Sequence, residues 1–122
     1  MSPKNSFQVL SHPVRFRIVE ILASGEHMSG EISDAVTGDY GIGRAAVSKH
    51  LAVLRDSGWV DVLVEGPVRW YKLRDEWWRL VDRDLEWLRY LWKRRTGPLS
   101  KNDADPAWAS TADPFVQTPL DD

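Results

Sequence analysis

A regular stripe of apolar residues marks the segment from Gly43 to Gly58. Val47, Leu51 and Leu54 recur at the spacing that places side chains on one packed face of a helix. The opposite face carries small, hydroxyl-bearing and cationic residues: Arg44, Ala45, Ser48, Lys49 and Ala52. The glycine at the end can stop the helix. The pattern therefore predicts a helix over 44–57 with one buried face and one polar face.

Three shorter helices are predicted before this one. They cover 6–10, 13–23 and 29–36. In the third, Ile32, Ala35 and Val36 are expected to face the core. The run 37–41 then predicts a turn, and Gly43 is a suitable N-cap for the helix that follows. Two helices joined by a turn in this order are typical of a helix-turn-helix.

Two β-prone runs follow the helix at 44–57. They cover 59–65 and 68–73, and a Gly66-Pro67 turn separates them. Two such strands around a short turn predict a hairpin. A hairpin directly after the second helix of a helix-turn-helix is the wing of a winged-helix domain. The predicted fold is therefore mainly α with a β-hairpin wing.

The longest predicted helix covers 75–95. Acidic residues at its start and basic residues at its end match the helix dipole. An apolar seam runs along it over two heptads and consists of Trp78, Val81, Leu85, Leu88 and Trp92. One small domain cannot easily bury so broad a face, so we expect a partner chain to cover it. The alternatives are a terminal helix that caps its own core and aromatic walls around a small-molecule pocket between subunits.

Composition bounds the class of protein. The chain has 122 residues, 43% hydrophobic and 28% charged, which suits one soluble domain over 1–95. The C-terminal run 96–122 holds four Pro, five Asp and one Lys, and predicts an extended acidic tail with Trp108 and Phe115 as its aromatic residues. The formal net charge is −2, but because the tail is acidic, residues 1–95 are slightly basic. This part of the chain remains compatible with DNA binding.

Several classes of site are excluded by residue type. The chain has no cysteine, which excludes disulfides, thiolate metal sites and cysteine nucleophiles. No basic leader precedes an apolar run, and no stretch approaches the length of a membrane span, so the expected location is the cytoplasm, without membrane contact. Ser48 and His50 point apart on a helix and cannot form a catalytic pair, and no phosphate-binding glycine loop is present. We therefore expect no enzyme activity and no cofactor.

The polar face of the helix at 44–57 has the chemistry of a DNA reader. Small residues permit close approach, hydroxyls can bond to bases or phosphates, and cations neutralise phosphate. Arg44 and Lys49 favour DNA contact over idle surface charge because of their place on this helix. His50, at the border of the apolar face, can either pack or touch phosphate, and Arg15 and Arg17 favour pairing with Glu20 over phosphate contact.

Three segments resemble the motifs of ArsR-type winged-helix regulators, in the family's order. They are LSHPVRFRI at 10–18, AVSKHLAVLRDSG at 46–58 and EGPVRWYKL at 65–73. The resemblance covers about 8–90. It implies a homodimeric transcriptional regulator, usually a repressor, whose first and last helices build the dimer. It also implies a recognition helix in the major groove and a wing near the minor groove or backbone.

The resemblance also assigns roles to single residues. The DNA-contacting positions are Arg44, Ala45, Ser48, Lys49, His50, Arg55 and, in the wing 60–73, Arg69. The dimer positions are Phe7, Leu10, Trp78, Val81, Leu85, Leu88 and Trp92. The chain is expected to bind double-stranded DNA at an inverted-repeat operator and to repress transcription there. A small-molecule effector is possible but is not required. The rival hypothesis is a protein-interaction module that uses the Trp-rich helix at 75–95 on a winged-helix scaffold.

The chain departs from the family pattern in three places. The predicted link between the two helices of the helix-turn-helix is longer by a few residues, and Pro67 replaces a wing residue that is often basic. The metal-sensing members carry cysteines near the position of Met28, or a carboxylate–histidine set on the last helix. Here the last helix offers Asp82 and Asp84 without histidine, and the three histidines are widely spaced in sequence. We therefore expect no metal sensing.

Overall fold

The computed structural model describes residues 4–99 and divides after Trp87 into two parts, which are considered separately. The elements in chain order are α1 (Ser6–Leu10), α2 (Pro13–Ala23), β1 (His27–Met28), α3 (Ser29–Tyr40), α4 (Arg44–Asp56), β2 (Val60–Glu65), β3 (Val68–Leu73) and α5 (Trp78–Lys93). This architecture confirms the predicted fold class. The predicted tail at 96–122, including Trp108 and Phe115, lies outside the described residues beyond position 99.

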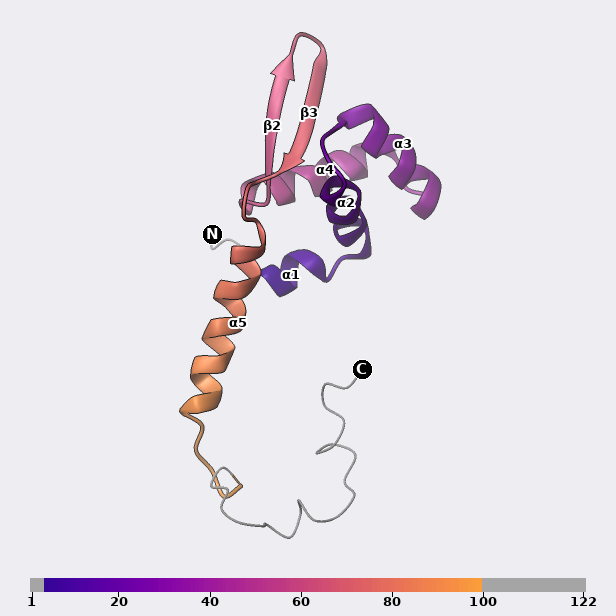
Figure 1. The fold of residues 1–122 in the computed structure, drawn as a ribbon. Coiled ribbons are helices and arrows are strands. Elements are labelled where there is room, and N and C mark those ends of the chain that lie inside the picture. The colour runs from indigo at the N-terminus through magenta and orange to yellow at the C-terminus, as the bar shows by residue number, and fades with distance from the viewer. Residues whose placement is uncertain (1–3, 100–122) are drawn as a thin grey trace. The chain divides into compact units, whose positions relative to one another are not determined.

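The core lies where α2, α3 and α4 meet the base of the hairpin (Figure 1). It consists of Val9, Val14, Ile18, Val19, Leu22, Ile32, Val36, Val47, Leu51, Leu54, Trp59, Val60 and Tyr71. The predicted apolar stripe of α4 is thus confirmed as buried. Ala35 was expected to face this core but is exposed, and Ser33 is buried in α3 instead.

The three strands form one antiparallel sheet in the order β1-β3-β2. In the hairpin Leu63 pairs with Trp70 and Val62 with Tyr71, so the two strands have the same alternation of faces. β1 was not predicted. It has only two residues, His27 and Met28, which pair with Tyr71 and Trp70, and two residues carry no periodic signal.

The expected long turn at 37–41 is wrong, because α3 continues through Tyr40. Two contacts tie its last turn to α2: Arg17 Nε donates to Asp39 at 3.3 Å, and the Tyr40 hydroxyl donates to the carbonyl of Pro13 at 3.5 Å. Gly41 then ends the helix with φ of 65°, and its N–H donates to the carbonyl of Thr37. Only 41–43 remain as the link, so the departure from the family spacing disappears.

The start of α5 also differs from the prediction. The chain turns at 75–77, where Glu76 has φ of 60°, and the helix begins at Trp78. The ring of Trp77 lies 5.7 Å from that of the buried Trp59, which fixes this turn against the core. The two acidic residues before the helix therefore do not occupy its first turn.

The short helix α1 is held by polar contacts from two other helices. At the start of α1, the carboxylate of Asp84 in α5 accepts a hydrogen bond from the Ser6 N–H at 2.6 Å. At the end of α1, Arg15 of α2 donates to the carbonyls of Val9 at 2.9 Å and Gln8 at 3.1 Å. The expected pairing with Glu20 is confirmed for Arg17, at 3.5 Å. It is wrong for Arg15, whose buried guanidinium donates to carbonyl groups of α1 instead.

In the second part, residues 88–99 carry exposed apolar side chains, most of them at the end of α5. They include Leu88, Tyr90, Leu91, Trp92 and Leu99. The guanidinium of Arg95 lies 3.7 Å from the centre of the Trp92 ring. No helix within residues 4–99 combines the length and apolar character needed to cross a bilayer.

Candidate nucleic-acid interface

The helix α4 separates its residues as the sequence predicted. Val47, Leu51 and Leu54 are buried. The residues predicted for the polar face are exposed except Ala52, which is half-buried. The exposed predicted contact residues on this helix are Arg44, Ala45, Ser48, Lys49 and Arg55. The polar face is therefore free to meet a partner.

A hollow of about 220 Å³ lies between the start of α3, the first half of α4 and β3. It is lined by Ser29, Gly30, Ser33, Arg44, Val47, Ser48, Leu51, Arg69 and Tyr71. We call it the α3–α4–β3 hollow. It brings together three predicted DNA contacts from two elements: Arg44 and Ser48 of α4 and Arg69 of the wing. Ala45, Lys49, His50 and Arg55 do not line it.

The start of α3 supplies the polar floor of this hollow. Glu31 turns back to accept the Met28 N–H at 2.8 Å, and the backbone N–H groups of the first turn point outward from the helix start. Ser33 is only 8% exposed, and among the described residues its Oγ is a buried polar atom without a hydrogen-bond partner. A helix N-terminus of this kind favours anions.

Sequence reasoning missed Ser29, Gly30 and Ser33 as site residues. The available signal was the pair of small residues at the start of α3, because a glycine in the first turn lets an anion approach the backbone N–H groups. A Cβ added at Gly30 would meet no atom within 4 Å. This position is therefore open toward the hollow.

The charged side chains around the hollow are two arginines and one carboxylate. Arg44 forms an ion pair with Asp34 of α3, and the two side chains are 64% and 68% exposed. Such an exposed pair is weak in water and can exchange its carboxylate for a phosphate. Arg69 is exposed on β3. Two guanidinium groups and a helix start thus surround one small volume.

Two predicted contact residues lie elsewhere. Arg55 is in the last turn of α4, where its Nε lies 3.4 Å from Asp56. His50 is half-buried and packs on α2: its ring centre lies 4.2 Å from that of His12, and its Nδ1 lies 3.4 Å from Nη1 of Arg15. Burial lowers the pKa of His50, and the charges of His12 and Arg15 lower it further.

The structure also shows the surroundings of the histidines and carboxylates that could bind a metal. His12 and His50 are far apart in sequence but are neighbours in space. Nδ1 of His12 accepts a hydrogen bond from the N–H of Val14, and the carboxylate of Asp84 accepts one from the N–H of Ser6. Within residues 4–99, no three His, Asp or Glu side chains gather as a metal-ligand group.

Comparison with known proteins identifies a helix-turn-helix in this chain. A family model described as a helix-turn-helix domain matches residues 10–62. The biofilm growth-associated repressor of Xylella fastidiosa, in two strains, is 42% identical over 57 residues, which are 47% of this chain and 46% of that protein. The chain thus aligns with about half the length of these curated relatives.

Solved structures extend the likeness beyond that segment. A crystal structure of an ArsR family transcriptional regulator has a TM-score of 0.59 and 28% identity, covering 74% of this chain and 89% of that one. The crystal structure of a possible transcriptional regulator for arsenical resistance has a TM-score of 0.58 and 27% identity, with 77% and 99% covered. The chain is therefore a winged helix-turn-helix protein with the fold of the ArsR-type transcriptional regulators.

Proposed function

We propose that this chain is a sequence-specific DNA-binding transcriptional regulator, a repressor that binds an inverted-repeat operator as a homodimer. The observation that carries the proposal is the α3–α4–β3 hollow. It places a helix N-terminus, Arg44, Ser48 and Arg69 around one volume beside the exposed face of a helix-turn-helix. The relatives described as a repressor and as transcriptional regulators support the same class of function.

In this proposal the hollow holds a backbone phosphate. The first turn of α3 donates its N–H groups to the phosphate oxygens, and Arg69 neutralises the charge from the wing. Arg44 leaves Asp34 when DNA binds, because a phosphate offers the guanidinium a bidentate partner. The wing tip carries Pro67 and adds no cation of its own.

The exposed face of α4 reads bases in the major groove. Ser48 is the side chain best placed to contact both the hollow and a base edge, and Ala45 allows close approach. Lys49 is exposed and contacts phosphate. His50 supports α4 by packing on His12 and Arg15 and reaches DNA less directly than these residues.

We further propose that dimerisation uses α1 and α5. In the first part of the chain Phe7, Trp78 and Leu85 are 47%, 50% and 43% exposed, which leaves an apolar surface for a partner. Leu10 and Val81 pack partly on their own core and would add less to the interface. In the second part Leu88 and Trp92 are exposed and continue the predicted seam.

An electrophoretic shift with the chain's own promoter fragment tests the DNA-binding claim. The full chain should retard this fragment in preference to a random duplex of equal length, and the affinity should fall steeply as salt rises because phosphate contacts release counterions. Equal, weak retardation of both duplexes would contradict sequence-specific binding.

The second candidate function is a protein-interaction module. It is favoured by the exposed tryptophans of α5, Trp78, Trp87 and Trp92, which a DNA reader does not itself require. The same gel decides between the two, because an interaction module that uses α5 needs no operator. The proposal includes no metal, since His12 caps α2, Asp84 accepts the Ser6 N–H and His27 lies beside Glu31.

A further inference from the structure

The sheet has a second face that takes no part in the proposed DNA contact. Residues alternate along β3, so Arg69 and Tyr71 lie on the side of the core and of the α3–α4–β3 hollow, whereas Trp70 and Lys72 lie on the outer side. The cross-strand partner of Trp70 is Leu63, which is 58% exposed. The outer face therefore presents an aromatic and an aliphatic side chain next to each other.

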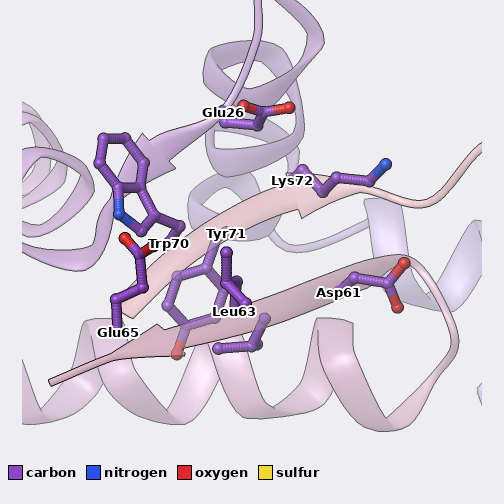
Figure 2. A pocket seen from close by; sticks show the side chains of 8 residues that line it. Glu26, Asp61, Leu63, Glu65, Trp70, Tyr71 and Lys72 are labelled. Carbon is purple, nitrogen blue, oxygen red and sulfur yellow. The ribbon is translucent and has the colours of Figure 1, made fainter. Parts of the chain in front are cut away.

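A pocket of about 340 Å³ lies on this outer face. It is lined by Glu26, Asp61, Val62, Leu63, Glu65, Trp70, Tyr71 and Lys72 (Figure 2). We call it the outer-face pocket. Its volume falls within the range of sites that hold small organic molecules. Figure 2 shows the indole of Trp70 and the side chain of Leu63 among the surrounding carboxylates.

The charges around the outer-face pocket are mainly negative. Asp61 pairs with Arg74 at 3.5 Å, and Lys72 pairs with Asp75 at 3.4 Å. Glu26 and Glu65 are exposed, and neither takes part in an ion pair among the residues that the structure describes. An apolar floor with two unneutralised carboxylates at its rim repels nucleic acid and complements a cation.

We propose that the outer-face pocket binds a small organic cation with an apolar body, such as an alkyl- or arylammonium ion. The apolar body rests on Leu63 and on the ring of Trp70, whose π face also attracts a cation. The carboxylates of Glu26 and Glu65 attract the ammonium group from the rim of the pocket. This site is separate from the α3–α4–β3 hollow, although Tyr71 lines both.

The test uses two probes of the same size, 2-phenylethylammonium and the neutral 2-phenylethanol. The full chain is titrated with each, without DNA, and the indole N–H signal of Trp70 is followed by NMR after assignment with Trp70→Phe. We expect a saturable shift with the ammonium probe and at least about tenfold weaker binding of the alcohol. Titration without DNA keeps this result independent of the proposed regulatory function.

Variants locate the cation. Glu26→Gln and Glu65→Gln should each weaken the ammonium probe about two- to fivefold, because each removes one exposed charge. Asp82→Asn, an equally simple change at an exposed position of α5, should leave the titration unchanged. The proposal is overturned if the ammonium probe gives no saturable shift, if both probes bind equally, or if Asp82→Asn weakens binding as much as the two glutamate variants.

Discussion

The ring of His50 in α4 lies 4.2 Å from the ring of His12, the N-cap of α2. Arg15 approaches the same imidazole at 3.4 Å while its other nitrogens hold the end of α1. Three side chains thus connect the proposed dimerisation helix, the core and the proposed DNA-reading helix.

Mild acid should therefore destabilise the fold through His50. Burial, His12 and Arg15 lower its pKa in the folded state, so the unfolded chain binds a proton first as the pH falls through about 6.5. The stability that the fold has while His50 is neutral is fully present above that pH and is lost as the pH falls below it. Urea unfolding between about pH 7.5 and about pH 5.5 should show a smaller loss for His50→Asn than for the wild type. Equal losses in both would contradict this role.

A glycine pair in α3 tests the phosphate site without harming the fold. Gly30 lines the α3–α4–β3 hollow, whereas Gly38 lies on the same helix away from it, and a Cβ at either would meet no atom within 4 Å. Gly30→Ala and Gly38→Ala should each stabilise the helix by about 0.5–1 kcal/mol. Only Gly30→Ala should weaken DNA binding, because its methyl group occupies the approach to the first-turn N–H groups.

Thermal unfolding and fluorescence anisotropy with labelled DNA measure the two effects separately. If Gly30→Ala is more stable and binds DNA as well as Gly38→Ala does, the phosphate does not sit in the hollow. If both variants lose DNA binding equally, the loss reflects α3 as a whole and the assignment of this site is again wrong.

Two neighbouring arginines should differ sharply in their effect on stability. Arg15 is buried and donates to two carbonyls at the end of α1, so Arg15→Met should cost about 1–3 kcal/mol in the free energy of unfolding. Arg17 forms partly exposed ion pairs with Glu20 and Asp39, so Arg17→Met should cost about 0–1 kcal/mol. Chemical denaturation of both variants checks the order, and a larger loss for Arg17→Met would refute it.

The proposed dimer depends on apolar side chains of α5. Replacing Leu88 and Trp92, both exposed, with glutamate should yield monomers, because charges cannot be buried unpaired in an apolar interface. Leu63→Glu changes another exposed leucine, on the hairpin, and serves as the control that should leave the dimer intact. Light scattering gives the mass of each. A dimer that survives the double substitution would place the interface elsewhere.

The features that the sequence predicted well are those with strong local periodicity. The stripe of Val47, Leu51 and Leu54 located both faces of α4, and the alternation around Gly66-Pro67 located the hairpin. These signals depend on nearest neighbours along one element. They needed no knowledge of the fold.

Features set by tertiary contact were missed. A glycine at position 38 suggested an early end for α3, but the contacts of Asp39 and Tyr40 with α2 outweigh its low helix propensity. The α3–α4–β3 hollow gathers Gly30, Ser48 and Arg69 from three separate elements, so no single window of sequence could show it. The neighbouring rings of His12 and His50 were hidden for the same reason.

The most direct test of the central claim is footprinting on genomic fragments captured by the full chain. We expect protected inverted repeats whose half-sites lie about one helical turn, roughly 34 Å, apart. On such a site Lys49→Ala and Arg44→Ala should weaken binding to all sequences, because both side chains are proposed to contact phosphate. Ser48→Ala should also reduce discrimination against random DNA by about 1–3 kcal/mol. Capture without a shared repeat, or equal losses on operator and random DNA for all three variants, would contradict the account.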